Sequence, residues 1–301
     1  MSKKSNTLFY TYTPQQLFIK IRTIYLNKYY NLYMNSMEWT GIEPETEDYI
    51  MRQLWSKGTV AAWDYEAIED CGFAPYSVFG YGYQDVPTEV QLINTRNVPG
   101  FPKKNLIVNK DVVLGYFQRN HKPVQNIVEY YVDRMTQVEM VINTNLELHK
   151  MPYLIGIDET DKTSANNVIQ KILNNELVVF ANLDELNIVK TLVNNTPYII
   201  DKLYAYKNNL ESELLTFLGL DNSQVDVDKL AVDQINANNQ LINSNAEGYE
   251  KELNKFCKKI KEVLGYDIGV KKTSQIAQSV HQDMDHSNSN MEDKNETGGT
   301  L

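Results

Sequence analysis

The stretch NNTPYIIDKLYAYKNNLESELLTFLGL, residues 194–220, has the pattern of one long amphipathic helix. Thr196 is suited to cap its first turn, Pro197 to its first helical position and Gly219 to its end. At 1.5 Å per residue, roughly 23 residues give a rod about 34 Å long. The apolar positions recur every three or four residues and form one edge: Ile199, Leu203, Tyr206, Leu210, Leu214 and Phe217. A surface helix of an ordinary α/β domain would show the same periodicity. The pattern alone therefore does not distinguish such a helix from one with a more specific role.

A second stretch of similar length and design lies at residues 123–150. Between the two, residues 151–195 predict a small α/β insert, with a strand, a helix and a second strand. Two long helices around a small insert have little core of their own, so this arrangement favours packing against other copies of the chain. The apolar positions of the second stretch are Val124, Ile127, Tyr131, Met135, Val138, Ile142 and Leu146.

The remaining segments differ in character. Residues 14–36 and 45–56 predict two helices, and Gly58 ends the second. Short aromatic and β-branched runs between residues 59 and 121, broken by Gly and Pro, predict a small antiparallel barrel or sandwich. Residues 221–245 are polar and weakly patterned, and a charged helix follows them. The polar, low-complexity residues 273–301 predict a disordered tail.

Composition limits the possible functions. The 301 residues carry a net charge of -10, so the chain is poorly suited to neutralising phosphates along a nucleic acid. Its 20 tyrosines suit interfaces, although AT-rich coding bias explains them equally well. The sequence has no apolar run long enough for a membrane span and no apolar core of a signal peptide. Cys71 and Cys257 lie far apart, which fits a reducing compartment rather than a disulfide scaffold.

No motif predicts catalysis. The sequence lacks a phosphate-binding GxxxxGK[ST] loop and an HExxH motif. DVDKLAVD, residues 226–233, begins like a calcium loop but lacks the central Gly and the closing Glu. HQDMDH, residues 281–286, could hold a transition metal, although solvated polar sequence is the favoured interpretation. His149 is expected to interact with the C-terminus of the helix over 123–150. We therefore expect no catalytic residue, no metal site and no cofactor.

Within the first stretch, TPYIIDKLYAYKNNLESELLTFLGL resembles the stem helix of portal proteins, also called upper collar or head-tail connector proteins, of small short-tailed, protein-primed bacteriophages. MEWTGIEP, residues 37–44, is similar to the segment between the first two helices of that family. The order of elements agrees from about residue 10 to residue 270, and the tail is not covered. The matching positions are Pro197-Tyr198, Asp201-Lys202-Leu203, Lys207-Asn208 and Thr216-Phe217-Leu218-Gly219.

The resemblance implies an α+β, portal-like fold assembled as a ring, twelvefold in assembled particles. It implies long stem helices, a small β-barrel-like (SH3-like) wing and an α/β clip. The implied segments are N-terminal helices at 1–58, the wing at 59–122, stem helices at 123–150 and 196–219, the clip at 151–195, a channel loop at 220–245, a helical crown segment at 246–272 and a tail at 273–301.

The same resemblance implies a non-enzymatic protein of the virion, at the capsid vertex where head and tail join, assembled in the host cytoplasm. Genomic DNA would pass through the ring during packaging and ejection. The implied partners are further copies of the chain, major capsid and scaffolding proteins, the packaging ATPase, lower collar or tail proteins and double-stranded DNA, with no membrane. The rival hypotheses are an adaptor or scaffold-like assembly protein without DNA passage, and an enzyme whose site is not recognisable.

The resemblance also implies roles for individual residues of this sequence. Lys202 matches the motif lysine and is expected to face the DNA, together with Asp226, Asp228, Lys229 and Asp233 of the channel loop. The family's loop carries paired lysines, so this more acidic loop is expected to repel phosphate. Lys3 and Lys4 are the candidates for docking the packaging machinery. Whether a packaging RNA is also a partner stays open, because this N-terminus is less basic than that of the family. The six apolar residues at 199–217 are expected to form the seam between copies.

Overall fold

The computed structural model describes residues 12–67, 69–94, 97–150, 153–156, 190–193, 197–220 and 232–273. The chain divides into two compact units. The first consists of Met1–Asn27 and Tyr130–Glu211, and the second of Lys28–Glu129 and Ser212–Leu301. Helices and strands occur together, which confirms the predicted α+β class.

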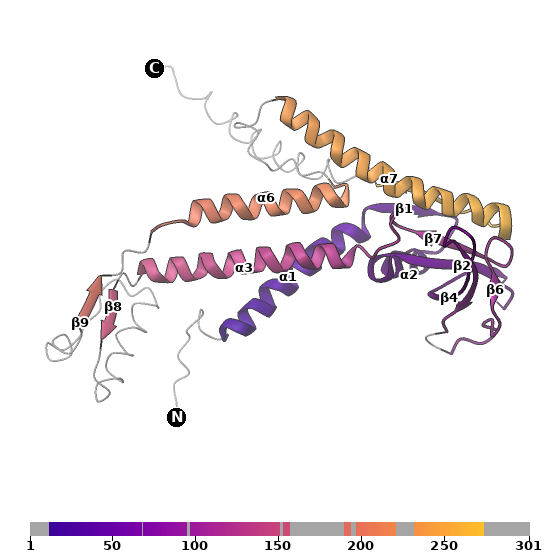
Figure 1. The fold of residues 1–301 in the computed structure, drawn as a ribbon, viewed down its shortest axis with the longest axis horizontal. Helices are drawn as coiled ribbons and strands as arrows, with labels where there is room; N and C mark the ends of the chain where they lie inside the picture. The colour runs from indigo at the N-terminus through magenta and orange to yellow at the C-terminus, as the bar shows by residue number, and fades with distance from the viewer. Residues whose placement is uncertain are drawn as a thin grey trace, which may run out of the picture. The chain divides into compact units, whose positions relative to one another are not determined.

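The elements are labelled in Figure 1. The helices are α1 (Pro14–Met34), α2 (Pro44–Lys57), α3 (Gln125–Lys150), α6 (Ile200–Leu218) and α7 (Val232–Leu264). The strands are β1 (Met37–Thr40), β2 (Thr59–Tyr65), β3 (Asp70–Ala74), β4 (Tyr76–Tyr81), β5 (Pro87–Leu92), β6 (Leu106–Ile107), β7 (Val112–Tyr116), β8 (Tyr153–Gly156), β9 (Lys190–Val193) and β10 (Gly269–Lys272).

Local signals in the sequence explain where the first two helices begin and end. Thr13 and Gln16 form a reciprocal cap before α1: the Thr13 hydroxyl accepts from the Gln16 N–H at 3.2 Å, and the Gln16 side chain accepts from the Thr13 N–H at 2.9 Å. Helix α2 has Pro44 at its start and acidic residues in its first turn, which the helix dipole favours. Gly58 ends α2, as the sequence predicts, with a left-handed φ of 74° and its N–H bonded to the Leu54 carbonyl.

In the second unit, the residues predicted to form a barrel or sandwich form two three-stranded antiparallel sheets, in the orders β3-β2-β7 and β4-β5-β6. The described strands do not close into a barrel, so the SH3-like closure expected from the resemblance is not seen among them. Their shared core contains Ala61, Trp63, Val90, Leu106 and Val112. On β2 and β7 the alternate positions Val60, Ala62 and Val113 are buried as well, so both faces of this sheet are covered there. Strand β1 pairs with β10, which brings residues 37–40 beside residues 269–272.

Helix α7 covers this unit and corrects one prediction. The sequence predicts a loop through residue 245, but residues 232–245 form the first half of α7. From Ile242 onward α7 carries a buried apolar stripe that steps by four and three, and the helix packs against strands β7, β10 and β2. Near its first half, the Asn245 side chain donates to the Thr216 carbonyl at 2.9 Å, and Ala246 lies close to Gly219, so this part of the helix packs on residues 216–219. The stripe consists of Ile242, Ala246, Tyr249, Leu253, Phe256 and Ile260.

In the first unit, α6 runs antiparallel to α3 (Figure 1). Residues 134 and 139 of α3 contact residues 206 and 207 of α6, whereas the later residues 145 and 149 contact residues 197 and 198, just before α6. The buried face of α3 here contains Val132, Met135, Val138 and Ile142. Strands β8 and β9 pair antiparallel, from Tyr153 opposite Val193 to Gly156 opposite Lys190. The helix and the second strand predicted between residues 160 and 181 lie outside the described residues.

Helix α6 begins later than predicted. Its first residue is Ile200, and the Ile199 carbonyl accepts the N–H of Leu203 at 3.1 Å. Pro197 lies before the helix because its carbonyl accepts the side-chain amide of Asn145 at 3.1 Å. Thr196, the predicted cap, lies outside the described residues. The predicted end at Gly219 is confirmed: its φ is 68°, and the Leu220 N–H reaches back to the Leu215 carbonyl at 2.9 Å.

The packing of α7 on β7 predicts opposite effects for two Gly→Ala changes. At Gly115 on β7, an added Cβ would lie 2.7 Å from the ring of buried Phe256, so Gly115→Ala should destabilise the fold by roughly 1–3 kcal/mol. At exposed Gly248 on α7, nothing lies within 4 Å, so Gly248→Ala should stabilise by about 0.5–1 kcal/mol through helix propensity. Thermal unfolding at matched protein concentration measures both. Equal stability of Gly115→Ala and the parent chain would contradict this packing.

Candidate functional site

Three helices of the first unit meet at the carboxylate of Glu139 on α3. One of its oxygens accepts the hydroxyl of Tyr25 on α1 at 2.8 Å and the ammonium of Lys207 on α6 at 2.6 Å. The Glu139 side chain is 20% exposed and that of Lys207 14% exposed, so the ion pair is shielded from much of the solvent. Burial, and then the hydrogen bond to Glu139, raise the pKa of Tyr25, which therefore stays a donor at neutral pH. The contact fixes α1 and α6 against one point of α3.

Two further polar contacts hold the same three helices. Arg22 on α1 donates to Asp133 on α3 at 2.6 Å. Arg134, on the next position of α3, donates to the hydroxyl of Tyr130 at 2.7 Å and to the hydroxyl of Tyr206 on α6. Sequence patterning placed Tyr206 on the apolar edge of its helix, whereas its hydroxyl in the structure is the partner of an arginine. Such partners cannot be identified from helical periodicity, because they come from residues more than 70 positions away.

The residues predicted to form the seam between copies differ in burial within the single chain, and the seam stays a prediction. Leu210 is 3% exposed and Leu214 0% exposed. Ile199, Leu203 and Phe217 are half-buried, and Tyr206 is exposed. Helical periodicity identified the apolar edge correctly but could not show which element covers it. The large apolar side chains that the first unit does leave exposed include Ile19, Ile24, Tyr130, Val141, Leu146, Tyr198 and Tyr204.

Of the five residues predicted to face DNA, two have a described backbone. Lys202 is exposed in the first turn of α6, next to Asp201. Asp233 lies in the first turn of α7 rather than in the predicted loop. Asp226, Asp228 and Lys229 lie outside the described residues, as do Lys3 and Lys4. The roles of these residues stay predictions.

The described residues contain no cluster of His, Cys, Asp and Glu suited to a metal ion, and HQDMDH lies outside them. His149, in the last turn of α3, donates from Nδ1 to the Asn145 carbonyl at 2.7 Å, and its ring lies edge-on to Tyr198. No helix within the described ranges is long and apolar enough to cross a bilayer.

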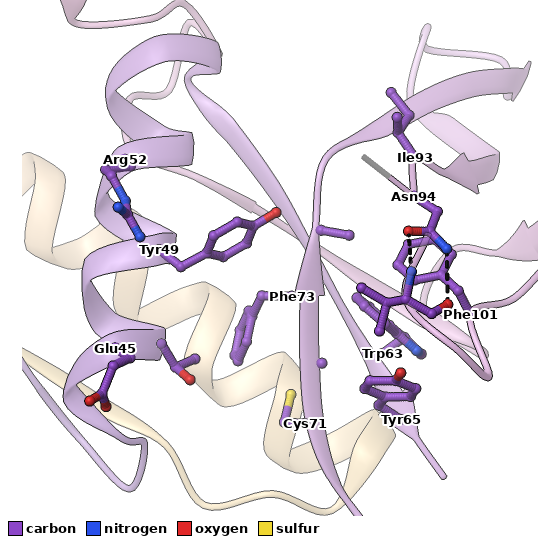
Figure 2. Close-up of a pocket in the computed structure, with 14 residues that line it drawn as sticks. Glu45, Tyr49, Arg52, Trp63, Tyr65, Cys71, Phe73, Ile93, Asn94 and Phe101 are labelled. Carbon is purple, nitrogen blue, oxygen red and sulfur yellow. Dashed lines mark hydrogen bonds between the residues drawn. The ribbon is translucent and has the colours of Figure 1, made fainter. Parts of the chain in front are cut away.

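The second unit contains a cavity of about 370 Å³ along the edge of strand β3. In Figure 2, Tyr49, Arg52 and Phe73 lie on the α2 side, and Trp63, Tyr65 and Phe101 lie on the other side. The sequence analysis did not identify this site, because its lining comes from α2, from strands β2 and β3, and from Ile93, Asn94, Val98 and Phe101. The indole Nε1 of Trp63 is buried and has no hydrogen-bond partner within the described part of the chain.

The wall of this cavity is held in place by hydrogen bonds. The Asn94 side chain donates to the Val98 carbonyl at 3.0 Å and accepts the Val98 N–H at 2.9 Å (Figure 2). The Tyr65 hydroxyl donates to the Pro99 carbonyl. These contacts hold Asn94, Val98 and Pro99 in place without a ligand, so this wall of the cavity is preformed.

The fold has relatives among solved structures. A chain in the structure of the portal and tail of native bacteriophage P68 superposes with a TM-score of 0.50 at 14% sequence identity, covering 93% of this chain and 95% of that chain. A portal protein of the HK97 family from Corynebacterium diphtheriae gives a TM-score of 0.44 at 11% identity, covering 87% of this chain and 95% of that one. The first likeness defines the fold as that of a phage portal protein.

Sequence comparison gives the family. The model of the family described as Phage Connector (GP10) matches residues 89–277, which is more than half of the chain. The chain belongs to the phage connector family, and its function is that of a head-tail connector, or portal. The resemblance stated from the stem helix is thereby confirmed. Members of this family are structural components at a capsid vertex of the phage particle, where portal rings join capsid and tail proteins.

The Glu139 contact predicts a clear difference between two charge deletions. Glu139→Ala should destabilise the fold by roughly 1–3 kcal/mol, because it leaves the shielded Lys207 ammonium and the Tyr25 hydroxyl without this acceptor. The matched control is Glu262→Ala on α7, where the carboxylate is 59% exposed and 3.8 Å from Lys258, and where the loss should stay under about 1 kcal/mol. Thermal unfolding measures the loss of stability in both variants. Equal losses would show that Glu139 does not hold the helices together.

Proposed function

We propose that copies of this chain form a closed ring, twelve by likeness to the portal family, around an axial channel at one vertex of the capsid. Genomic double-stranded DNA enters through the ring during packaging and leaves through it during ejection. A ring of identical chains requires head-to-tail contacts, in which one surface of each copy meets a different surface of the next.

The observation that carries this proposal is membership of the connector family, together with the apolar surface that one chain leaves uncovered. Ile19 and Ile24 on α1 and Val141 and Leu146 on α3 are exposed large apolar residues of the first unit. Exposed apolar side chains that gather on long helices are typical of surfaces that other chains cover. Neighbouring copies supply that cover in the proposed ring.

The proposed channel is lined by Lys202 and by the segment that contains Asp226, Asp228, Lys229 and Asp233. Each phosphate contact on a basic wall would add salt-sensitive affinity and oppose sliding of the DNA. A net charge of -10 per chain, with few lysines at the channel, limits this affinity. The ring therefore guides DNA without holding it tightly.

The proposed partners are the major capsid and scaffolding proteins, the packaging ATPase and the lower collar or tail proteins. Lys3 and Lys4 are proposed to dock the packaging machinery, and a packaging RNA is one possible component of it. The protein is proposed to be assembled in the host cytoplasm and to have no enzymatic activity and no cofactor. The alternative of an adaptor without DNA passage is not favoured, because family membership supports the connector function.

The first test is the mass of the purified protein in solution. Mass photometry should show a closed assembly many times heavier than the 34.7 kDa chain, with one dominant copy number. Leu210→Asp should lower the yield of rings by destabilising each chain, because it places a charge at a position buried within the protomer. A parent chain that stays monomeric at micromolar concentration would contradict the ring.

The second test concerns the proposed channel segment. Replacing residues 221–231 with a Gly/Ser linker of equal length should leave rings intact, because no buried apolar residue of the described core is changed. Preparations of particles assembled with this variant should contain fewer DNA-filled heads than those of the parent. Lys229→Ala alone should change DNA retention little, and its effect should shrink further as the salt concentration rises. Loss of the rings would show that the segment is structural. Normal DNA retention would exclude its role at the channel.

A further inference from the structure

The hairpin formed by β4 and β5 presents large apolar side chains to solvent. Tyr83 at its tip is 100% exposed, and Phe79, Tyr81 and Val86 beside it are more than half exposed. The tip is ordered by hydrogen bonds: the Gly82 N–H donates to the Val86 carbonyl at 2.8 Å, and the Asp85 N–H donates to the Gly82 carbonyl at 3.1 Å. Four such side chains within eight residues, on a turn of fixed shape, are typical of a binding surface. Tyrosine suits this role because it offers much contact area for little lost side-chain entropy.

The cavity along β3 has complementary properties. Its volume of about 370 Å³ lies within the ~300–1,000 Å³ typical of pockets that receive a ligand or side chain. Tyr49, Phe73, Trp63 and Phe101 give it an aromatic lining (Figure 2). Strand β3 is at the edge of its sheet, with β2 as its one strand partner among the described residues. Edge strands keep main-chain groups available to another chain.

Charge at the two surfaces is also complementary. Arg52 is exposed at the cavity, where its Nε donates to the Asp48 carbonyl at 3.2 Å. Asp85 is exposed on the hairpin, with a left-handed φ of 53° that turns the chain there. Within the described residues neither side chain forms an ion pair. Charges of opposite sign on two surfaces steer their association and fix its register.

We infer that the tip of the β4–β5 hairpin of one copy, residues 81–86, inserts into the β3 cavity of the next copy around the ring. The inference rests on the proposed function, because it supplies the two different surfaces that a head-to-tail ring requires. Tyr83 enters the aromatic cavity, and Asp85 pairs with Arg52 at the rim. The occupant is a second copy of this chain, because both surfaces repeat once per subunit, one offers an exposed tyrosine and the other an aromatic cavity, and their charges at Asp85 and Arg52 are opposite.

Charge exchange gives the main test. Arg52→Asp and Asp85→Arg should each weaken association at least about fivefold, because like charges then face each other across every contact. The double variant should recover most of the loss. Lys110→Asp, an exposed charge reversal in the same unit outside both surfaces, is the control and should change little. The measurement is the fraction of protein in rings, by mass photometry, across a dilution series.

Cysteine pairing gives an independent readout. Burial raises the pKa of Cys71 and of Cys257 to about 12, so introduced cysteines are the reactive thiols near pH 8. A mixture of Tyr83→Cys chains with Ile93→Cys chains should give disulfide-linked dimers, and the double variant should give a ladder of linked copies. Tyr83→Ser should weaken ring formation roughly tenfold, as expected for an aromatic residue at the centre of a contact.

The outcomes distinguish this inference from the proposed function. If the parent forms rings, but the single charge reversals leave them unchanged or the double variant recovers nothing, the hairpin–cavity contact is wrong and the ring stands. If the mixed cysteine variants form rings without disulfide-linked dimers, the contact is likewise wrong. If the parent itself forms no ring, the proposed function fails and this inference fails with it.

Discussion

The apolar stripe of α7 is the contact on which the second unit depends. Its buried side chains lie against β7, β2 and β10, and Phe256 lies so close to Gly115 that no larger residue fits on that strand. Most of the stability of a long helix in a protein comes from such packing rather than from helix propensity, and the part of α7 from Ile242 onward is an example. The same unit carries the β4–β5 hairpin and the cavity along β3.

The first unit follows a different principle. Its long helices bury one face among themselves and are fixed by polar contacts, above all the Glu139 carboxylate that joins α1, α3 and α6. Their outer faces keep exposed Ile, Val, Leu and Tyr side chains, which is a poor arrangement for a lone chain in water. In the proposed ring, each copy would cover apolar surface of the next. In this account, folding buries one part of the apolar surface of each chain, and assembly buries another part.

The sequence predicted the elements with strong local signals. The helices α1, α2, α3 and α6 follow from apolar periodicity, and Gly58 and Gly219 mark ends where a left-handed residue is required. The predictions for the start of α6 and for the first half of α7 were wrong. The Pro197 carbonyl accepts the Asn145 side chain ahead of α6, and the contacts of Asn245 and Ala246 with residues 216–219 are not visible in a polar-looking segment of sequence. The burial of Leu210 and Leu214, the Glu139 contact and the β3 cavity could not be predicted, since each depends on residues distant in sequence. The connector family was predicted correctly from the motif around Lys202.

The central claim is that this chain forms a ring at one capsid vertex, with the genome passing along the axis. An electron-microscopy reconstruction of DNA-filled particles, calculated without imposed icosahedral symmetry and with a small tag on this chain, tests it most directly. The account predicts a tagged ring at a single vertex, with DNA density on its axis and the tail attached beyond it. Tagged density at several vertices, or a ring away from the path of the DNA, would contradict it.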